Sequence, residues 1–475
     1  MRIALVTSEV APFSKTGGLA DVCGSLPAEL EKLGHEVVVI SPLYRGVRAH
    51  GPERAPFRLR VPVGRVVDAG VARLGRHWFI DHEPFYDREG LYGSPEGDYE
   101  DNAARFTLLA RGAMELLGAI GFEPDLVQAH DWQAGLVPVY LRTIYADEFA
   151  KAKSVMTIHN LGYQGVFWHL DLPIFGLDWS LYNWRQLEFY GKVNLLKGGI
   201  VFADAITTVS PTYAKEIQTK AFGCGLEGVL AERAEKLTGI LNGIDMAEWD
   251  PSADAHLPAT FSWKDPAGKA ACKRALQERM KLPRRDEVPV IGFVGRLVEQ
   301  KGVELLVRAA EFLAQLDVQV AILGSGEARF QGPLQRLGAL YGERLSVEIA
   351  FDAALAHLIE AGSDFFVMPS RYEPCGLTQM HSLRYGAVPI VRKTGGLADT
   401  VEDGRTGIVF ESYSSDALVE AVERALALWA KPKEYARVQR AGMKLDFGWP
   451  QRAAEYVEVF QGISGSASRR RRKRD

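Results

Sequence analysis

The sequence predicts an α/β protein of two domains, each built around a doubly wound parallel sheet. Apolar runs typical of buried strands alternate with segments whose apolar residues recur at helical spacing. This alternation starts afresh after about residue 245. The length of 475 residues also exceeds what one hydrophobic core can organise and suits two or three domains.

The first half of the chain shows the alternation clearly. A strand over 2–10 is followed by a loop with two glycines and by a helix in which leucines recur at helical spacing until Gly34 ends it. A second buried strand over 35–42 completes a βαβ unit, the building block of a parallel sheet. Later strands, each followed by a loop, are expected over 125–132, 154–163 and 205–213.

The second half repeats the pattern after a polar, proline-containing stretch. A strand over 289–297 leads to a helix over 303–316, and further strands are expected over 318–326, 364–370 and 387–393. We therefore expect two Rossmann-like domains whose strands end toward a common deep cleft, where ligands of open α/β sheets usually bind.

The expected domain bounds follow from these elements. The first domain covers 1–245 and the second covers 246–465, including an amphipathic helix over 447–460. Residues 466–475 are expected to form a disordered tail, because a run of consecutive basic residues lies there.

The composition is that of a soluble globular protein, with 47% hydrophobic and 24% charged residues and a net charge of −4. Outside the basic tail the chain is more acidic still, which disfavours a nucleic-acid partner. No apolar run approaches the roughly 20 residues that span a bilayer, and the N-terminal stretch is wrongly flanked for a signal peptide. We therefore expect a cytoplasmic protein that does not bind membranes, whereas its oligomeric state is not indicated.

Neither a metal nor a cofactor is expected. The cysteines, Cys23, Cys224, Cys272 and Cys375, lack CxxC or CxxH spacing, which argues against zinc and against a disulfide framework. A DxD metal motif, a GxGxxG fingerprint and a P-loop are absent from the sequence. Their absence disfavours a dehydrogenase and a P-loop nucleotidase.

The stretch GFVGRLVEQKG, residues 292–302, has the features of a phosphate site. Arg296 lies just past a strand, and Lys301 lies where the next helix is expected to begin. There a guanidinium, an ammonium and free helix amides would converge, which favours a phosphate or diphosphate. A surface loop with two solvated cations is the alternative.

A second polar turn, PSRYEPCGLTQM, follows the expected strand over 364–370. Its Glu373 would accept hydrogen bonds from sugar hydroxyls, beside exposed backbone N–H groups around Cys375 and Gly376. Taken singly, such a carboxylate more often caps or pairs with a helix, and such a cysteine more often fills a core.

The heptapeptide KTGGLAD occurs twice, over 15–21 and again over 393–399. A tandem repeat does not explain this, because no shorter repeat fills the interval. In both copies a lysine and paired glycines precede a helix, so the backbone can approach a ligand closely at the helix start. We interpret the copies as one local solution used by two domains that face the same ligand.

Two further polar clusters follow strands of the first half. HDW places Asp131 at one strand end, and HNLGYQG places His159 at the next, together with Asn160, Tyr163 and Gln164. A single histidine at a strand end is more often structural. Two such clusters opposite a phosphate-holding domain favour a ligand site.

These motifs together resemble those of bacterial glycogen synthases and plant starch synthases, which are retaining glucosyltransferases of the two-domain GT-B type. The resemblance implies transfer of glucose from ADP-glucose or UDP-glucose to the nonreducing 4-hydroxyl of an α-1,4-glucan, with glycogen or a malto-oligosaccharide as acceptor. Only the basic tail falls outside it. The motifs that carry it, in chain order, are KTGGLADV, GLYG, HDW, HNLGYQG, TTVSPTY, FGCGL, GILNGID, GRLVEQKG, PSRYEPCGL and TGGLADTV.

The resemblance also implies residue roles. Arg296 and Lys301 would hold the diphosphate, Glu373 the glucosyl hydroxyls and His159 the anomeric region, while Asp131 would line the cleft. The departing phosphate would take the acceptor proton on the front face, so no carboxylate nucleophile is required. The residues expected to bind the donor are Lys15, Gly17, Gly18, Asn242, Phe351, Cys375, Gly376, Leu377, Thr394, Gly395 and Gly396.

Two departures from the family pattern leave the choice between adenine and uracil open. Phe351 stands where many members carry tyrosine, and Leu358 stands where an arginine is expected. Another GT-B transferase is an alternative, although His381 replaces the second glutamate that many sucrose-type enzymes carry eight residues after the first. A non-catalytic nucleotide-sugar sensor is the alternative from a different class.

Overall fold

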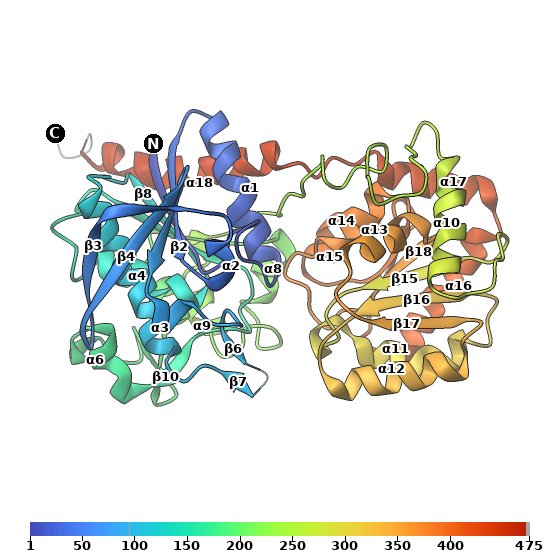
Figure 1. Cartoon of the computed structure of the whole chain (residues 1–475), viewed down its shortest axis with the longest axis horizontal. Helices are drawn as coiled ribbons and strands as arrows, with labels where there is room; N and C mark the ends of the chain where they lie inside the picture. The colour runs from blue at the N-terminus through green and yellow to red at the C-terminus, as the bar shows by residue number, and fades with distance from the viewer. Residues whose placement is uncertain (95, 472–475) are drawn as a thin grey trace. The chain divides into compact units, whose positions relative to one another are not determined.

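The structure, a computed structural model, describes residues 1–94 and 96–471, with side chains described as far as residue 465. The chain forms two compact units. Unit 1 comprises Met1–Val209, Ala214–Leu241 and the chain from Trp449 onward, and unit 2 comprises Ser210–Tyr213 and Asn242–Gly448. In Figure 1, unit 1 contains the blue and green elements with the last red helix, and unit 2 contains the yellow and orange strands.

Unit 1 is organised by a nine-stranded sheet in the order β14-β13-β9-β8-β1-β2-β5-β4-β3. The strands from β14 to β5 run parallel, and β4 and β3 close one edge as antiparallel strands. The chain leaves β1 toward β2 and later returns on the other side as β8, so the topological switch point lies between β1 and β8. The bounds are β1 Arg2–Val6, β2 Glu36–Pro42, β3 Glu53–Val63, β4 Arg65–Leu74, β5 His77–Asp81, β8 Leu126–His130, β9 Lys153–Ile158, β13 Ala205–Thr208 and β14 Leu237–Gly239.

Helices cover this sheet, and a small antiparallel sheet in the order β10-β12-β11 is inserted after β9. The inner strands are buried along almost their whole length, as expected for a parallel sheet covered on both faces. The longer helices of the unit are α1 Gly18–Lys32, α4 Asn102–Ala119, α5 Leu136–Leu141, α7 Leu195–Phe202 and α18 Trp449–Arg471. The short helices are α2 Arg45–Arg48, α3 Glu83–Tyr86, α6 Leu172–Phe175, α8 Pro211–Glu216 and α9 Glu227–Ala231, and α8 is shared with unit 2. The short strands are β6 Gly93–Ser94, β7 Gly97–Asp98, β10 Val166–Trp168, β11 Glu188–Phe189 and β12 Lys192–Asn194. The 3₁₀ turns are Trp132–Ala134, His169–Asp171, Trp179–Leu181 and Ala234–Lys236.

Unit 2 contains a six-stranded parallel sheet in the order β17-β16-β15-β18-β19-β20. Its first strand, β15, is again central, and the switch point lies between β15 and β18. The strands are β15 Val290–Val294, β16 Gln319–Gly324, β17 Leu345–Ile349, β18 Phe365–Met368, β19 Val388–Arg392 and β20 Ile408–Phe410. The helices are α10 Gly268–Arg279, α11 Val303–Leu313, α12 Ala328–Leu340, α13 Ala353–Gly362, α14 Thr378–Arg384, α15 Gly395–Thr400, α16 Ser415–Trp429 and α17 Pro432–Met443, with a 3₁₀ turn η5 at Glu299–Lys301.

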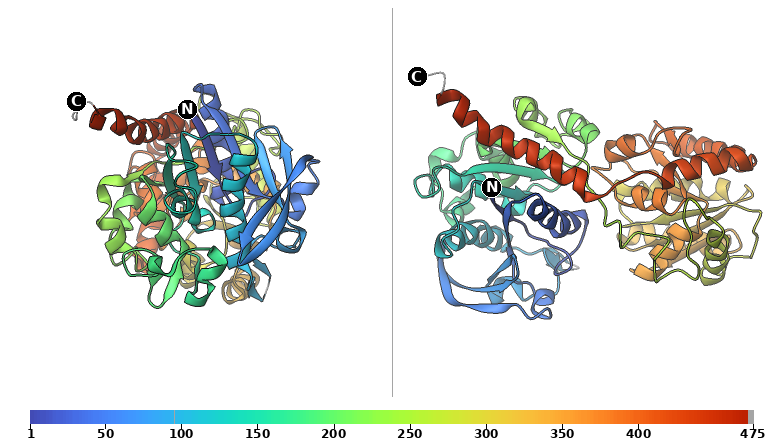
Figure 2. Two further views of the ribbon diagram at one scale, coloured as in Figure 1. Left: turned by 90° about the vertical axis from the view of Figure 1, so that its left-hand side faces the viewer. Right: turned by 90° about the horizontal axis from the view of Figure 1, so that it is seen from above.

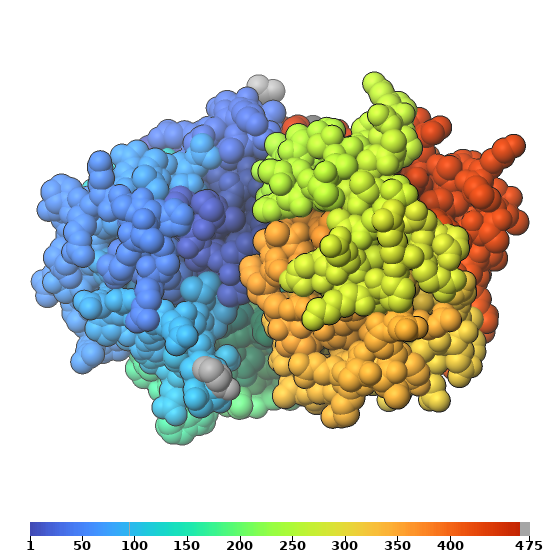
Figure 3. Space-filling view, turned by 45° about the vertical axis from the view of Figure 1, so that its right-hand side comes forward, coloured from blue at the N-terminus to red at the C-terminus, as the bar shows by residue number. Residues whose placement is uncertain are grey.

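The polar stretch before α10 is packed onto unit 2 and does not hang free as a linker. Its Asp254 is buried and accepts hydrogen bonds from His357 (2.7 Å) and from the Tyr385 hydroxyl (2.6 Å). Phe261 from the same stretch packs in a buried cluster with Tyr385. Figure 3 shows this yellow-green segment on the surface of unit 2.

The structure differs from the expected domain bounds at the C-terminus. The last helix, α18, packs against α1 and β9 of unit 1, although its residues were assigned to the second domain. Its buried residues Ala453, Tyr456 and Phe460 form one apolar stripe, which explains why it needs a partner surface. Figure 2 shows α18 running along unit 1.

The expected disordered tail, 466–475, is helical in part. Residues 466–471 continue α18, and residues 472–475 lie outside the described part of the chain. Among the helices that the structure describes, none is long and apolar enough to cross a membrane.

Candidate active site

The first copy of KTGGLAD follows β1 of unit 1 and is anchored by a buried carboxylate. Glu9 is 3% exposed and accepts hydrogen bonds from the Thr16 amide (2.5 Å) and hydroxyl (2.6 Å). The Tyr92 hydroxyl donates to the same carboxylate at 2.5 Å. Two segments far apart in sequence are therefore joined around the loop that carries Lys15.

Lys15 and Gly17 of this loop are open to solvent. Lys15 forms an exposed ion pair with Asp21 at 2.6 Å. Gly17 has an extended backbone (φ −164°), and a Cβ built there would meet no described atom within 4 Å. Gly18 starts α1. Nothing within the described protein therefore requires a glycine at position 17.

Asp131 follows β8, on the other side of the switch point, in a strained backbone conformation. Its φ of 55° and ψ of −176° lie in a region that residues other than glycine rarely adopt. The carboxylate accepts the His159 amide at 2.7 Å, which fixes the loop after β9. Burial raises the pKa of Asp131 to about 7, although the amides of His159 and Asn160 oppose this. Strain of this kind is concentrated at functional sites.

His159 forms a buried pair with His130, with 3.0 Å between His159 Nε2 and His130 Nδ1. Burial lowers the pKa of His159 to about 3 and the pKa of His130 well below its ordinary value, so both rings are neutral and one donates to the other. Within the described chain, the buried His159 Nδ1 has no hydrogen-bond partner. Gln164 instead acts inside the protein, because its amide donates to Leu161 and Cys224 carbonyls.

Unit 2 brings three of the expected residues to its own switch point. Arg296 follows β15, and Lys301 ends η5 just before α11. Lys301 Nζ donates to Glu373 Oε2 at 2.6 Å, and Ser370 Oγ donates to the same oxygen at 3.1 Å. The Arg296 side chain is exposed and makes no ion pair or hydrogen bond with the residues described. A buried carboxylate, an ammonium and a free guanidinium thus follow the two strands that flank the switch point.

The second copy of KTGGLAD is used differently from the first. Gly395 adopts φ 44°, and a Cβ there would lie 1.8 Å from the Glu373 carbonyl oxygen. A Cβ on Gly396 would lie 2.0 Å from the Cys375 carbonyl oxygen, and the Gly396 amide donates to Glu373 O at 3.1 Å. These glycines are therefore packed against the backbone that carries Glu373. A ligand is not needed to explain them.

Asp399 of this copy binds the segment 210–213. Its carboxylate accepts the Thr212 amide (2.8 Å) and hydroxyl (2.7 Å), and Ser210 Oγ donates to Pro374 O at 2.6 Å. In the first copy the equivalent Asp21 pairs with Lys15 instead. These bonds explain why four residues from the first half of the chain belong to unit 2.

The remaining donor candidates lie at several places in unit 2. Asn242 is buried, and its Oδ1 has no partner within the described residues. Phe351 is 96% exposed after β17, an edge strand two positions from β15. Cys375 and Thr394 are buried, Gly376 adopts φ 73°, and Leu377 immediately precedes α14.

Sequence reasoning missed two features of these sites. Glu9 was not singled out, although an acidic residue directly after a buried strand was a usable signal. His381 was considered only as a missing glutamate. Its ring stacks on the Trp249 indole with 3.6 Å between the ring centroids and 5° between the ring planes. The other face of that indole stacks on His357, with 4.0 Å between the centroids.

Within the described residues, no group of three or more His, Cys, Asp or Glu side chains is arranged to hold a metal ion. None of the four cysteines forms a disulfide; Cys224 is exposed and the other three are buried.

Comparison with known proteins connects both units to one family. Residues 2–232 match the starch synthase catalytic domain, and residues 276–444 match the glycosyl transferases group 1 family. The chain is 46% identical to a glycogen synthase of Koribacter versatilis, covering 97% of this chain and 98% of that one. It is 48% identical to a glycogen synthase of Myxococcus xanthus, with 98% and 99% covered.

Solved structures agree. The catalytic domain of starch synthase IV from Arabidopsis thaliana, bound to ADP and acarbose, is similar with a TM-score of 0.88 and 33% identity over 98% of this chain and 99% of that one. Sucrose-phosphate synthase from Thermosynechococcus elongatus shares the fold at a TM-score of 0.61 and 18% identity, with 98% and 99% covered. The expected two-domain GT-B fold is thereby confirmed. The identity over nearly the whole chain, the family match and the shared fold together place this chain in the glycogen synthase family, as an enzyme that transfers glucosyl units in glycogen synthesis.

Proposed function

We propose that this enzyme transfers glucose from ADP-glucose to the nonreducing 4-hydroxyl of an α-1,4-glucan with retention of configuration. The observation that carries the proposal is the Lys301–Glu373 pair beside the free Arg296 at the switch point of unit 2. Fixed positive charge there suits a diphosphate, and the carboxylate suits sugar hydroxyls. The ADP bound to the Arabidopsis relative supports adenine over uracil.

The proposed reaction needs no protein nucleophile. The bond between C1 of glucose and the diphosphate oxygen breaks, and a bond from C1 to the acceptor O4 forms on the same face. The acceptor hydroxyl proton passes to an oxygen of the departing diphosphate. Arg296 and Lys301 offset the negative charge that grows on the diphosphate, which takes the place of a metal ion.

The residues of unit 1 are proposed to act on the glucosyl end of the same donor. His159 is neutral and offers Nδ1 near the anomeric centre, while Asp131 positions its loop. Lys15 and Gly17 would complete the donor site. We also propose that the protein works in the cytoplasm, where its free thiols stay reduced.

An assay for ADP release tests this function directly. With glycogen as acceptor, we expect ADP to appear with ADP-glucose and much more slowly with UDP-glucose. Isothermal titration of the two donors should show the same order of affinity. ADP-glucose that binds without ADP release would instead indicate a nucleotide-sugar sensor.

Glu9→Gln is expected to lower kcat/KM for the donor about tenfold, because the amide cannot accept from Thr16 and Tyr92 as the carboxylate does. The affinity for free ADP should stay unchanged, since the diphosphate is proposed to bind unit 2. Glu36→Gln is the matched control, because Glu36 is exposed and its side chain pairs only with Arg2 among the residues described. Equal kinetics of the two variants would show that Glu9 has no positioning role.

The contribution of His159 to stability should fall as the pH is lowered from 7 to 5. Unfolded His159 takes up a proton below about 6.5, whereas folded His159 remains neutral down to about 3. The unfolded state therefore binds more protons, and stability is lost as the pH falls. Between pH 7 and 5, we expect the free energy of unfolding of His159→Gln to fall by about 2 kcal/mol less than that of the wild type, as measured by urea unfolding. Identical losses would contradict a buried, neutral His159.

A further inference from the structure

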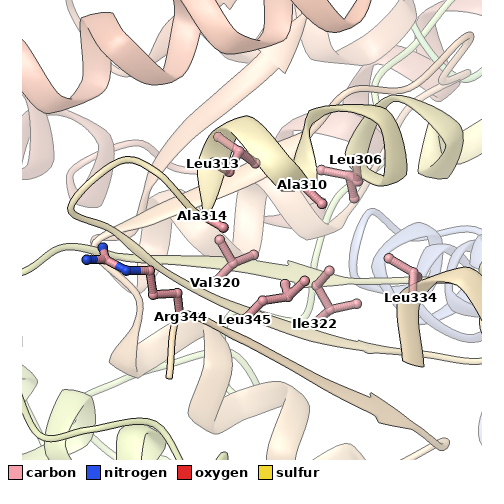
Figure 4. Close-up of a pocket in the computed structure, with 9 residues that line it drawn as sticks. All are labelled: Leu306, Ala310, Leu313, Ala314, Val320, Ile322, Leu334, Arg344 and Leu345. Atoms are coloured by element: carbon pink, nitrogen blue, oxygen red, sulfur yellow. The ribbon is translucent and has the colours of Figure 1, made fainter. Parts of the chain in front are cut away.

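Two hollows of unit 2 lie away from the proposed donor contacts, and they differ in character. The first lies between α11, β16, α12 and β17 and is lined almost entirely by aliphatic side chains. Figure 4 shows its one charged lining residue, Arg344, with the guanidinium turned away from the leucines. That guanidinium donates to the Leu316 carbonyl at 2.5 Å. This hollow belongs to the hydrophobic core and offers nothing to a polar ligand.

The second hollow, which we call the Arg308 pocket, has a volume of about 380 Å³. This lies within the range of about 300 to 1,000 Å³ that is usual for small-molecule sites. Its polar lining comes from η5, α11, α12 and the loops after β18 and β20. The polar residues are Glu299, Glu304, Arg308, Arg329, Arg371 and Tyr413.

The guanidinium groups of this pocket are only partly satisfied. Glu299 accepts from both Arg371 and Arg329, with the Arg329 contact 3.3 Å long, and Arg329 also donates to Glu327 at 2.5 Å. Arg308 is exposed and makes no ion pair or hydrogen bond with the residues described. Three lining arginines stand against two lining glutamates and Glu327, which pairs with Arg329, so the charges balance at 3 − 3 = 0. The Arg308 guanidinium therefore remains for an anion, and phosphate matches its fork geometry best.

The pocket also contains an unused acceptor. Tyr413 donates its hydroxyl to one oxygen of Glu304. The other oxygen, Oε2, is buried and has no partner in the described chain. A buried carboxylate oxygen without a donor is costly, and a ligand hydroxyl would satisfy it.

We propose that the Arg308 pocket is a second ligand site, separate from the donor site, and that it binds a phosphorylated sugar. The phosphate pairs with Arg308, Arg329 and Arg371, and a sugar hydroxyl donates to Glu304 Oε2. A plain anion would leave Glu304 unsatisfied. A neutral sugar would leave the guanidinium groups unused.

The site is connected to the proposed donor contacts by short steps. Glu299 and Lys301 belong to the same 3₁₀ turn, and the Arg371 amide donates to the Gln300 carbonyl at 2.9 Å. Arg371 lies two residues before Glu373, the partner of Lys301. A ligand that draws Arg371 away from Glu299 therefore acts on both segments that hold the Lys301–Glu373 pair. This coupling rests on the proposed function, whereas binding to the pocket does not.

Binding is tested by isothermal titration of glucose 1-phosphate into protein saturated with ADP, which keeps the probe from the donor site. We expect a single site, with binding at least about tenfold tighter than that of inorganic phosphate or glucose. Arg308→Gln should weaken it by about tenfold or more. Arg336→Gln, an exposed arginine on α12 outside the pocket, should stay within about twofold of the wild type.

The proposal is overturned if glucose 1-phosphate does not bind in the presence of ADP, or if the two variants bind it equally well. Inorganic phosphate that binds as tightly as the sugar phosphate overturns the Glu304 contact. For the coupling, glucose 1-phosphate should change the donor KM of the wild type at least about threefold and leave that of Arg308→Gln unchanged. An unchanged wild-type KM with intact binding overturns the coupling alone.

Discussion

Lys301→Ala is expected to lower kcat/KM for ADP-glucose by about 100-fold and to destabilise the protein by about 3 kcal/mol. The activity falls because a charge on the leaving diphosphate loses its partner as it grows in the transition state. The stability falls because Glu373, whose side chain is 5% exposed, keeps a buried charge without its ion pair. Urea unfolding and steady-state kinetics measure the two effects.

Arg296→Ala should separate these effects. Arg296 pairs with none of the described residues, so its removal should lower kcat/KM about 10- to 100-fold and leave stability unchanged. Lys393→Ala is the control for losing a lysine, because Lys393 pairs with Glu411 where both side chains are exposed. It should change neither quantity. Unchanged donor kinetics in either Arg296→Ala or Lys301→Ala would refute the diphosphate assignment.

The twin heptapeptides should respond oppositely to alanine. At Gly395 φ is 44°, and an added Cβ would lie 1.8 Å from the Glu373 carbonyl oxygen. Gly395→Ala should therefore lower the free energy of unfolding by about 2 kcal/mol or more. It should also weaken ADP binding, because the loop that carries Glu373 is displaced. At Gly17 the backbone is extended and the space is open. Gly17→Ala should therefore leave stability and ADP affinity intact and lower turnover.

Calorimetry with ADP, urea unfolding and ADP-release kinetics on both variants make the comparison. A Gly17→Ala protein with wild-type turnover would mean that no ligand approaches the first loop. A Gly395→Ala protein with wild-type stability would contradict the close packing of the second loop against Glu373.

The fold could be predicted because its signals are local. Buried strands such as β15 and β18 are apolar along their length, and helical repeats lie between the strands, so the alternation identifies parallel sheets. The partner of α18 could not be predicted in this way. An apolar stripe shows that a helix is packed, but the stripe carries no information about which unit covers it.

The candidate site was predictable to the extent that residue type implies chemistry. Arg296 and Glu373 were placed after strands and Lys301 at the start of a helix from the sequence, yet the Lys301–Glu373 contact joins residues 72 positions apart and needs the fold. The glycine pair at 395 and 396 was expected to let a ligand approach the backbone closely. Only the structure shows that the approaching group is the Glu373–Cys375 backbone.

The central claim is retaining glucosyl transfer from ADP-glucose to a glucan, and proton NMR of the reaction mixture tests it most directly. With a malto-oligosaccharide as acceptor, we expect a new internal α-1,4 anomeric signal to grow in step with released ADP. A β-anomeric signal would contradict retention. ADP release without a longer glucan would contradict transfer to the 4-hydroxyl.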